Sequence, residues 1–218
     1  MEPYELELLP LDTPDDDPRW AAYLDLFAIV FLEGRAPEDG VAAFRRHRRA
    51  DGATLGMVTA EGPGLDGRHV VAGLAWAPIR ANTGGNIVPV MAINTVAVRP
   101  THRRRGLMRM MMDHHLRRAR AEGFTLAALS ASEATIYGRF GVASRCVEWE
   151  IDTQRFAIRP EVAIAPGSLE FANPPLDENI FERLSAAHQA AHRGAFSPLG
   201  MHLAKADGTW DFDEQGPS

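Results

Sequence analysis

Hydrophobic and polar residues alternate with two different periods along this chain, which predicts a mixture of strands and helices. Residues 4–10 alternate with the period of a strand. A helix is predicted next, with Asp17 as its N-cap and Pro18 at its first helical position. The apolar face of that helix is expected to hold Trp20, Leu24, Phe27 and Phe31.

The middle of the chain is predicted to form a second helix followed by three strands. The helix is expected within residues 37–49. The strands are expected at residues 54–59, 70–79 and 87–98. Glycine-rich segments at residues 60–68 and 81–86 separate these strands and are typical of hairpin loops. Successive hairpins predict an antiparallel meander.

A long helix is predicted after these strands, over residues 105–122, and Gly123 is expected to end it. One stripe of this helix holds Met108, Met111, Met112, His115 and Ala119. A methionine cluster at helical spacing favours core packing over a cofactor site. Because His115 lies on the same apolar stripe, we expect it to be a partly buried, hydrogen-bonded histidine and not a ligand.

The rest of the chain suggests the end of one domain and the beginning of another. A strand at residues 124–130, a short helix around 132–140 and a strand around 144–151 are expected to complete the first unit. Beyond residue 156 several prolines indicate a linker, which a helix at 178–193 follows. We therefore expect a domain at residues 1–156, and a linker with the partial start of a second domain at 157–218.

Composition indicates a globular protein. The chain has 218 residues, of which 45% are hydrophobic, enough to build a core. It has neither an apolar run of membrane-spanning length nor the pattern of a signal peptide, so we expect a cytoplasmic protein with no membrane partner. Its single cysteine, Cys146, excludes an internal disulfide, and no His or Cys spacing indicates a metal site.

The most concentrated positive charge lies in a chain whose net charge is −6. The stretch "RPTHRRRGLM", residues 99–108, contains four arginines and one histidine directly after a strand and before a helix. Free N–H groups and the dipole at a helix N-terminus attract anions, so a phosphate or diphosphate site is one interpretation. A solvated basic loop and a nucleic-acid contact are the alternatives, although the acidic net charge argues against nucleic acid as a partner.

The segment "VAVRPTHRRRGLM" resembles the diphosphate loop of the GNAT superfamily of N-acetyltransferases. That pattern is an Arg or Gln, two residues, a Gly, one residue, and then a Gly or Ala. Here Arg103, Gly106 and Met108 stand at the three positions. The bulky Met108, together with "LSASEATIYGRFGVA", is similar to the Eis (enhanced intracellular survival) acetyltransferases. The resemblance is strong over residues 96–156.

This resemblance implies an α/β (α+β) GNAT fold: a central mixed, mostly antiparallel sheet with helices on both faces, splayed between its two central strands. It implies acetyl-CoA (coenzyme A) as cofactor. The coenzyme contacts that it implies are Val96, Ala97 and Val98 in the strand, Arg103, Arg104, Arg105, Gly106, Leu107, Met108 and Arg109 in the loop and helix, and Ser132 and Glu133 beyond. Tyr137 matches the tyrosine that protonates the departing thiolate.

The reaction that the resemblance implies is transfer of an acetyl group to a primary amine by direct attack. The amine belongs to an aminoglycoside, a polyamine or a lysine side chain, so the partner is a small molecule or a peptide. The base of Eis-like enzymes is a carboxylate at the end of a third domain, and this sequence ends at Ser218. Either the sequence is a fragment of a longer chain, or the protein uses another base, or it does not catalyse. Glu33 and residues 15–17 are conceivable replacements. The alternative is an acyl-CoA-binding protein without turnover. A homo-oligomer is also implied.

Overall fold

A computed structural model of the chain describes residues 4–131, 134–142, 159 and 178–200. The described residues fall into two compact units. The larger contains residues 4–130 and 178–200, and the smaller contains residues 131, 134–142 and 159. The strand expected around residues 144–151, Cys146 and the expected domain boundary near residue 156 lie outside the described residues.

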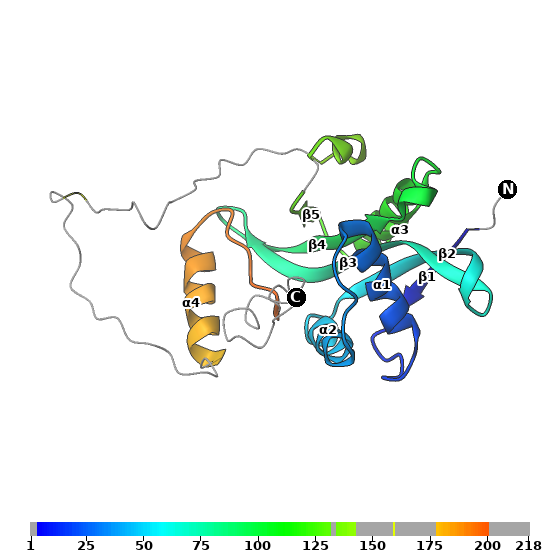
Figure 1. The fold of residues 1–218 in the computed structure, drawn as a ribbon. Helices are drawn as coiled ribbons and strands as arrows, with labels where there is room; N and C mark the ends of the chain where they lie inside the picture. The colour runs from blue at the N-terminus through cyan, green and yellow to red at the C-terminus, as the bar shows by residue number, and fades with distance from the viewer. Residues whose placement is uncertain (1–3, 132–133, 143–158, 160–177, 201–218) are drawn as a thin grey trace. The chain divides into compact units, whose positions relative to one another are not determined.

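One five-stranded sheet organises the larger unit (Figure 1). Its strands lie in chain order: β1 (Glu5–Leu9), β2 (Thr54–Leu65), β3 (Arg68–Asn82), β4 (Ile87–Val98) and β5 (Leu126–Leu129). The first four strands pair antiparallel, and β5 pairs parallel with β4. The predicted meander and the mixed, mostly antiparallel sheet are therefore confirmed.

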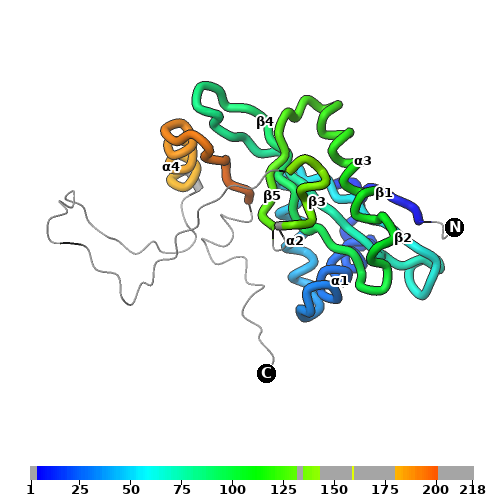
Figure 2. Tube along the Cα trace, turned by 90° about the horizontal axis from the view of Figure 1, so that it is seen from above, coloured from blue at the N-terminus to red at the C-terminus, as the bar shows by residue number. Residues whose placement is uncertain are grey.

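Helices cover both faces of this sheet (Figure 2). On one face lie α1 (Arg19–Phe31) and α2 (Glu38–Ala50), and on the other lies α3 (Leu107–Ala121). Two strand glycines show how closely the layers approach. A Cβ on Gly73 would lie 2.9 Å from Leu26 of α1, and one on Gly56 would overlap the imidazole of His115 in α3. Both helices thus pack against bare backbone, which fixes their distance from the sheet.

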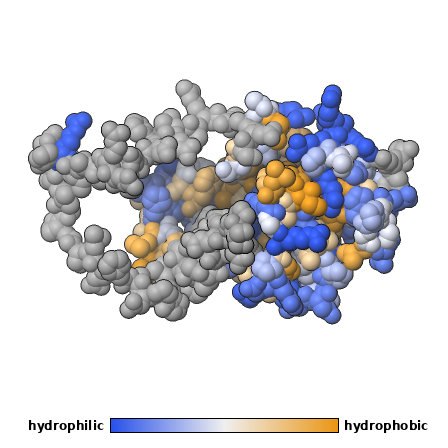
Figure 3. All heavy atoms as spheres, in the orientation of Figure 1, coloured by the Kyte–Doolittle hydropathy of each residue, from blue (hydrophilic) through white to orange (hydrophobic). Residues whose placement is uncertain are grey.

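The helix α1 differs from the prediction by one residue at its start, where Pro18 and not Asp17 is the N-cap, and it also differs at its end. The carboxylate of Asp17 accepts the Arg19 N–H at 2.9 Å, and Pro18 stands directly before the helix with helical backbone angles. Phe31, however, is 48% exposed, and Leu24 is only half-buried. The buried positions are Trp20, Tyr23, Leu26, Phe27 and Ala28. Phe31 is in the last turn, beyond this buried stripe, where Figure 3 shows hydrophobic residues at the surface.

The hairpin between β2 and β3 is tighter than predicted. Residues 60–68 were expected as a loop, but the strands continue until Asp66 and Gly67, whose φ angles are +51° and +73°. Two consecutive positive φ angles are typical of a two-residue turn whose twist matches that of the strands. A register shift between Glu61 and Leu65 accommodates the glycines inside β2.

The helix α4 (Glu178–Ala191) and the residues after it contact the other end of β3. The Gln189 side chain donates to the carbonyl of Arg80 at 2.6 Å, and the Asn82 side chain donates to the carbonyl of Gln189 at 2.7 Å. Phe196 forms a β-bridge with Ala81. Residues more than a hundred positions downstream thus continue along β3 where its pairing with β2 stops at Thr54.

The smaller unit contains two short turns of 3-10 helix, η2 (Ala134–Ile136) and η3 (Gly138–Phe140). One short helix was expected here. Gly138 begins the second turn, and Gly141, which has a φ of +81°, ends it.

Candidate functional site

A loop of arginines connects β4 to α3 at one end of the sheet. It consists of the 3-10 turn η1 (Pro100–His102) and residues 103–106. Arg104 and Gly106 both have left-handed backbone angles, with φ of +65° and +81°. A Cβ on Gly106 would meet nothing within 4 Å, so backbone conformation alone requires glycine there. Left-handed residues of this kind turn consecutive N–H groups toward one side and form anion-binding concavities.

The amides of this loop are open to a ligand. Met110 N–H donates to Gly106 at 2.9 Å and is the first amide of the helix with a helical bond. Among the described residues, no hydrogen bond occupies the N–H groups of Arg104, Gly106, Leu107, Met108 and Arg109. No side chain caps the helix. Amides at a helix N-terminus lie at the positive end of the dipole, so this arrangement suits a diphosphate.

The side chains of the loop surround these amides with positive charge. Arg103, Arg104, Arg105 and Arg109 are all exposed, whereas Leu107 is buried and Met108 is half-buried. The guanidinium of Arg105 donates to the hydroxyl of Tyr4 at 2.9 Å. The exposed guanidinium groups can form charge-assisted hydrogen bonds with phosphate oxygens. Met108, which departs from the small residue of the pattern, continues the helix and leaves its own N–H open.

The strand that leads into this loop contains a β-bulge. Ala75 pairs with Asn94 and Gly73 pairs with Ala97, so Thr95 and Val96 together oppose one residue of β3. Thr95 has a φ of +46°. For a β-branched residue this conformation costs about 1–3 kcal/mol and persists only where surrounding contacts hold it. Sequence reasoning did not identify Thr95, because its residue type favours ordinary strand geometry.

Beyond the bulge, the described residues give β4 a neighbour on one side only. Its pairing with β5 covers Val90 to Ile93, and within the described residues only β3 continues beside the rest of β4. The Arg99 N–H donates to Val71 of β3 at 2.8 Å. Because N–H groups alternate along a strand, those of Val98 and Val96 face away from β3, into the opening, and that of Ala97 faces β3. The splay implied by the resemblance is therefore present.

The remaining predicted residues belong to the smaller unit or lie outside the description. Tyr137 immediately precedes η3 and is 8% exposed. Tyr137 belongs to the smaller unit, and the arginine loop belongs to the larger one. Ser132 and Glu133 lie outside the described residues. The structure therefore brings together Val96–Val98 and Arg103–Arg109, and the roles of Tyr137, Ser132 and Glu133 stay predictions.

Two of the carboxylates considered as a base are held by arginines. Asp15 forms ion pairs with Arg49 at 2.6 Å and Arg45 at 3.0 Å, and the hydrogen bond from Arg49 lowers the pKa of Asp15. Asp17 binds Arg19 at 2.7 Å, which lowers the pKa of Asp17. A lower pKa makes a carboxylate a weaker base. Asp16 and Glu33 are exposed.

His115 is confirmed as a core residue. It has no exposed surface, and its Nδ1 accepts the indole N–H of Trp76 at 3.2 Å. Burial, together with the neighbouring His114 and Arg118, lowers the pKa of His115 to about 4. The ring is therefore neutral at pH 7. In the described parts of the chain, no three His, Cys, Asp or Glu side chains gather as a metal site would require.

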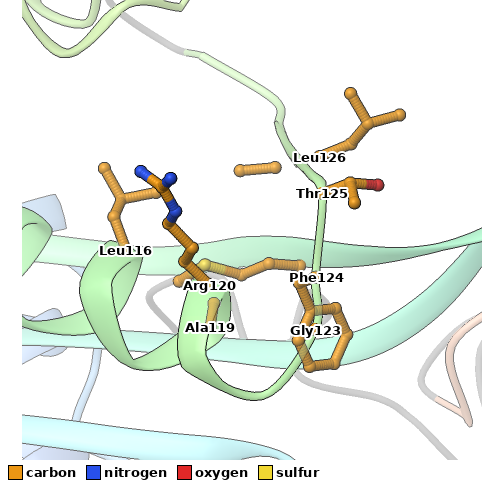
Figure 4. Close-up of a pocket in the computed structure, with 9 residues that line it drawn as sticks. Leu116, Ala119, Arg120, Gly123, Phe124, Thr125 and Leu126 are labelled. Carbon is orange, nitrogen blue, oxygen red and sulfur yellow. The ribbon is translucent and has the colours of Figure 1, made fainter.

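A groove at the far end of α3 is separate from the arginine loop. It has a volume of about 470 Å³ and lies between the C-terminal turn of α3 and the beginning of β5 (Figure 4). Leu116 and Arg120 line it from the helix, and Phe124 and Leu126 line it from the strand side. None of the predicted coenzyme contacts lines this groove. Among the described helices, none is long and apolar enough to cross a membrane.

Comparison with known sequences places this site in a family. Residues 16–144 match the acetyltransferase (GNAT) domain. The N-acetyltransferase Eis of Mycobacterium tuberculosis (strain ATCC 25177 / H37Ra) is 37% identical over 180 residues, which cover 80% of this chain and 43% of Eis. The chain thus spans less than half the length of that relative.

Solved acetyltransferases share the fold. One from Clostridium acetobutylicum, solved with acetyl-CoA, has a TM-score of 0.52 at 16% identity, covering 71% of this chain and 99% of that one. An aminoglycoside acetyltransferase from an uncultured soil metagenomic sample has a TM-score of 0.52 at 18% identity, covering 69% and 99%. The family match extends over more than half of the chain and includes the bulged strand, the arginine loop and the helix: the chain belongs to the GNAT acetyltransferase family.

Proposed function

We propose that this chain is an acetyl-CoA-dependent N-acetyltransferase that transfers an acetyl group to a primary amine by direct attack. The observation that carries the proposal is the set of amides at Arg104 and Gly106 to Arg109, which have no hydrogen bond among the described residues. They follow a strand beside whose last residues the described chain places only β3. The similarity to Eis, named an N-acetyltransferase, supports nitrogen as the acceptor atom. The acceptor is an aminoglycoside, a polyamine or a lysine side chain.

The residues of the larger unit fit a coenzyme A molecule. The open amides of Arg104 and of Gly106 to Arg109, together with the exposed arginines around them, would hold the diphosphate. The N–H groups of Val96 and Val98 would hold the pantetheine arm and stabilise charge on the carbonyl oxygen. Acetyl-CoA supplies the thioester whose acetyl group is transferred. Tyr137 would hold the proton for the sulfur on its Oη.

Two measurements test this proposal on the chain as it stands. Calorimetry should detect coenzyme A binding, and thiol release from acetyl-CoA should increase when spermidine or kanamycin is added. Absence of coenzyme binding would contradict the proposal. Binding without thiol release would instead favour the alternative, an acyl-CoA-binding protein without turnover. The ion pairs that hold Asp15 and Asp17 favour that alternative, because they leave these carboxylates poor bases.

Three further features stay proposals from the sequence. They are a domain boundary near residue 156, a homo-oligomeric assembly and a cytoplasmic location. Size-exclusion chromatography with light scattering would test the second, because a homo-oligomer predicts a mass that is a multiple of 23.9 kDa.

A further inference from the structure

The bulge in β4 is connected by hydrogen bonds to both helices on one face of the sheet. Asn94 Oδ1 accepts a hydrogen bond from the guanidinium of Arg48 in α2 at 3.0 Å and another from the hydroxyl of Thr95 at 3.1 Å. The hydroxyl of Tyr23 in α1 lies 3.3 Å from that of Thr95. A threonine hydroxyl has one proton, which goes to Asn94, so Tyr23 must be the donor to Thr95.

This network is buried. Tyr23 has no exposed surface and Arg48 is 2% exposed, with its guanidinium over the ring of Phe44 at 5.1 Å. Burying a guanidinium is costly, and a fold keeps one where it makes hydrogen bonds that an apolar residue could not. Here one of these bonds reaches Asn94, next to the left-handed Thr95. A β-branched residue leaves that conformation unless its surroundings hold it.

We propose that Arg48 and Tyr23 are positioning residues for acyl transfer, which act through Asn94 and Thr95 to hold the β4 bulge. The bulge determines which way the N–H groups of the next residues point, because one extra residue reverses their alternation along the strand. Arg48 and Tyr23 thereby aim the N–H group of Val96 into the opening beside β4. The inference rests on the proposed function, and it adds to that function the residues that orient the N–H group of Val96.

Two variants and a matched control test this role. Tyr23→Phe removes one hydroxyl, and Arg48→Met removes the guanidinium at similar length. Both should lower kcat at least tenfold and weaken the Kd of coenzyme A by a much smaller factor, because the diphosphate amides are elsewhere and the N–H of Val98 still holds the pantetheine arm. The control is Arg46→Met. Arg46 lies two positions before Arg48 in α2, is exposed and takes no part in the hydrogen bonds at the bulge, so kcat should stay unchanged.

A rescue experiment separates this role from a general effect on stability. Glycine adopts positive φ without strain, so Thr95→Gly added to Arg48→Met should restore part of the lost kcat. In the ligand-free protein, the amide NMR signals of residues 95–97 should shift in Tyr23→Phe while those of residues 104–109 do not. Tyr23→Phe leaves the core shape intact, which keeps the test valid if Arg48→Met fails to fold.

The outcomes distinguish this inference from the function on which it rests. If the unmodified chain neither binds coenzyme A nor releases thiol, the proposed function fails. If it does both, and Tyr23→Phe and Arg48→Met retain full kcat, only the positioning role is overturned. A loss of kcat in Arg48→Met that Thr95→Gly does not restore would also overturn it, because Arg48 would then act other than through the bulge.

Discussion

The two ends of α3 are built in opposite ways. At the C-terminal end the N–H of Gly123 donates to Arg120 at 3.2 Å and the N–H of Phe124 donates to Ala119 at 2.9 Å. With Gly123 at a φ of +90°, this pair of bonds is the Schellman motif, which satisfies the last carbonyls of a helix. At the N-terminal end no side chain caps the helix and the first amides have no hydrogen bond among the described residues.

The charged side chains also differ between the two ends of α3. Arg118 and Arg120 in the last turn face the negative end of the helix dipole and stabilise the helix. Arg103, Arg104 and Arg105 precede the positive end, where positive charge is unfavourable. An N-cap side chain contributes about 1 kcal/mol, and this helix forgoes it. The C-terminal end of α3 is therefore capped and has favourable charges. The N-terminal end is uncapped and is preceded by unfavourable positive charges, which suits it to bind an anion.

The largest expected effect separates binding at this open end from chemistry. Tyr137→Phe should lower kcat by about 100-fold or more, the typical contribution of a general acid, because the phenyl ring has no proton to give the sulfur. The Kd of coenzyme A should not change, since the diphosphate amides are intact. Steady-state thiol release and calorimetry measure the two quantities. An unchanged kcat would remove Tyr137 from the reaction and leave another group as the acid.

The next prediction concerns His115, which lies in the middle of α3 between these two ends. The pKa of His115 is about 4 in the fold and about 6.5 when unfolded, so the unfolded chain takes up the proton first as pH falls. The contribution of His115 to the free energy of unfolding should be fully present above about pH 6.5. At pH 5 the free energy of unfolding should be lower by about 2 kcal/mol. His115→Gln keeps an acceptor for the Trp76 N–H and cannot titrate.

Urea unfolding at pH 7 and pH 5 measures this difference. The decrease between the two pH values should be about 2 kcal/mol larger for the unmodified chain than for His115→Gln. Other groups titrate in both proteins and cancel in the subtraction. Equal decreases in the two proteins would mean that His115 is protonated in the folded state, contrary to its burial.

Much of this arrangement could be predicted from the sequence. The strand at residues 87–98 has the bounds predicted from its apolar pattern. They could be predicted because Gly84–Gly85 precede the strand and the arginine-rich residues 99–105 follow it. The bulge within it could not be predicted, because Thr95 is a good strand former whose left-handed angle depends on contacts with α1 and α2. Tertiary contacts of this kind leave no local sequence signal.

Two errors have simpler physical reasons. The hairpin at Asp66–Gly67 carries a recognised turn dipeptide, and the surrounding glycines concealed it because they belong to the strands themselves. Phe31 follows the apolar spacing of α1 but lies in its last turn, where no residue after Ala28 is buried. Periodicity alone therefore predicted burial that the end of the helix does not provide.

A paired substitution at the two helix ends compares them directly. Gly106 and Gly123 both have positive φ angles and free space around an added Cβ. Alanine should therefore destabilise the fold by about 1 kcal/mol at each position. Gly106→Ala should also weaken coenzyme A binding about tenfold, the loss expected when one charge-assisted hydrogen bond of about 1.5 kcal/mol is misaligned. Gly123→Ala should leave the Kd unchanged. Equal effects on binding would remove the distinction between the ends.

The smallest effect tests the charges at the two ends. Arg103→Gln should weaken coenzyme A binding several-fold at low salt, because an exposed guanidinium near a diphosphate contributes about 1 kcal/mol that salt screens. Arg120→Gln removes the same charge from the opposite end of α3 and should leave binding unchanged. Calorimetry at 50 mM and 500 mM NaCl should show the Arg103 effect shrink as salt rises. An effect that persists at high salt would indicate that Arg103 holds the loop in shape and does not attract the anion by charge.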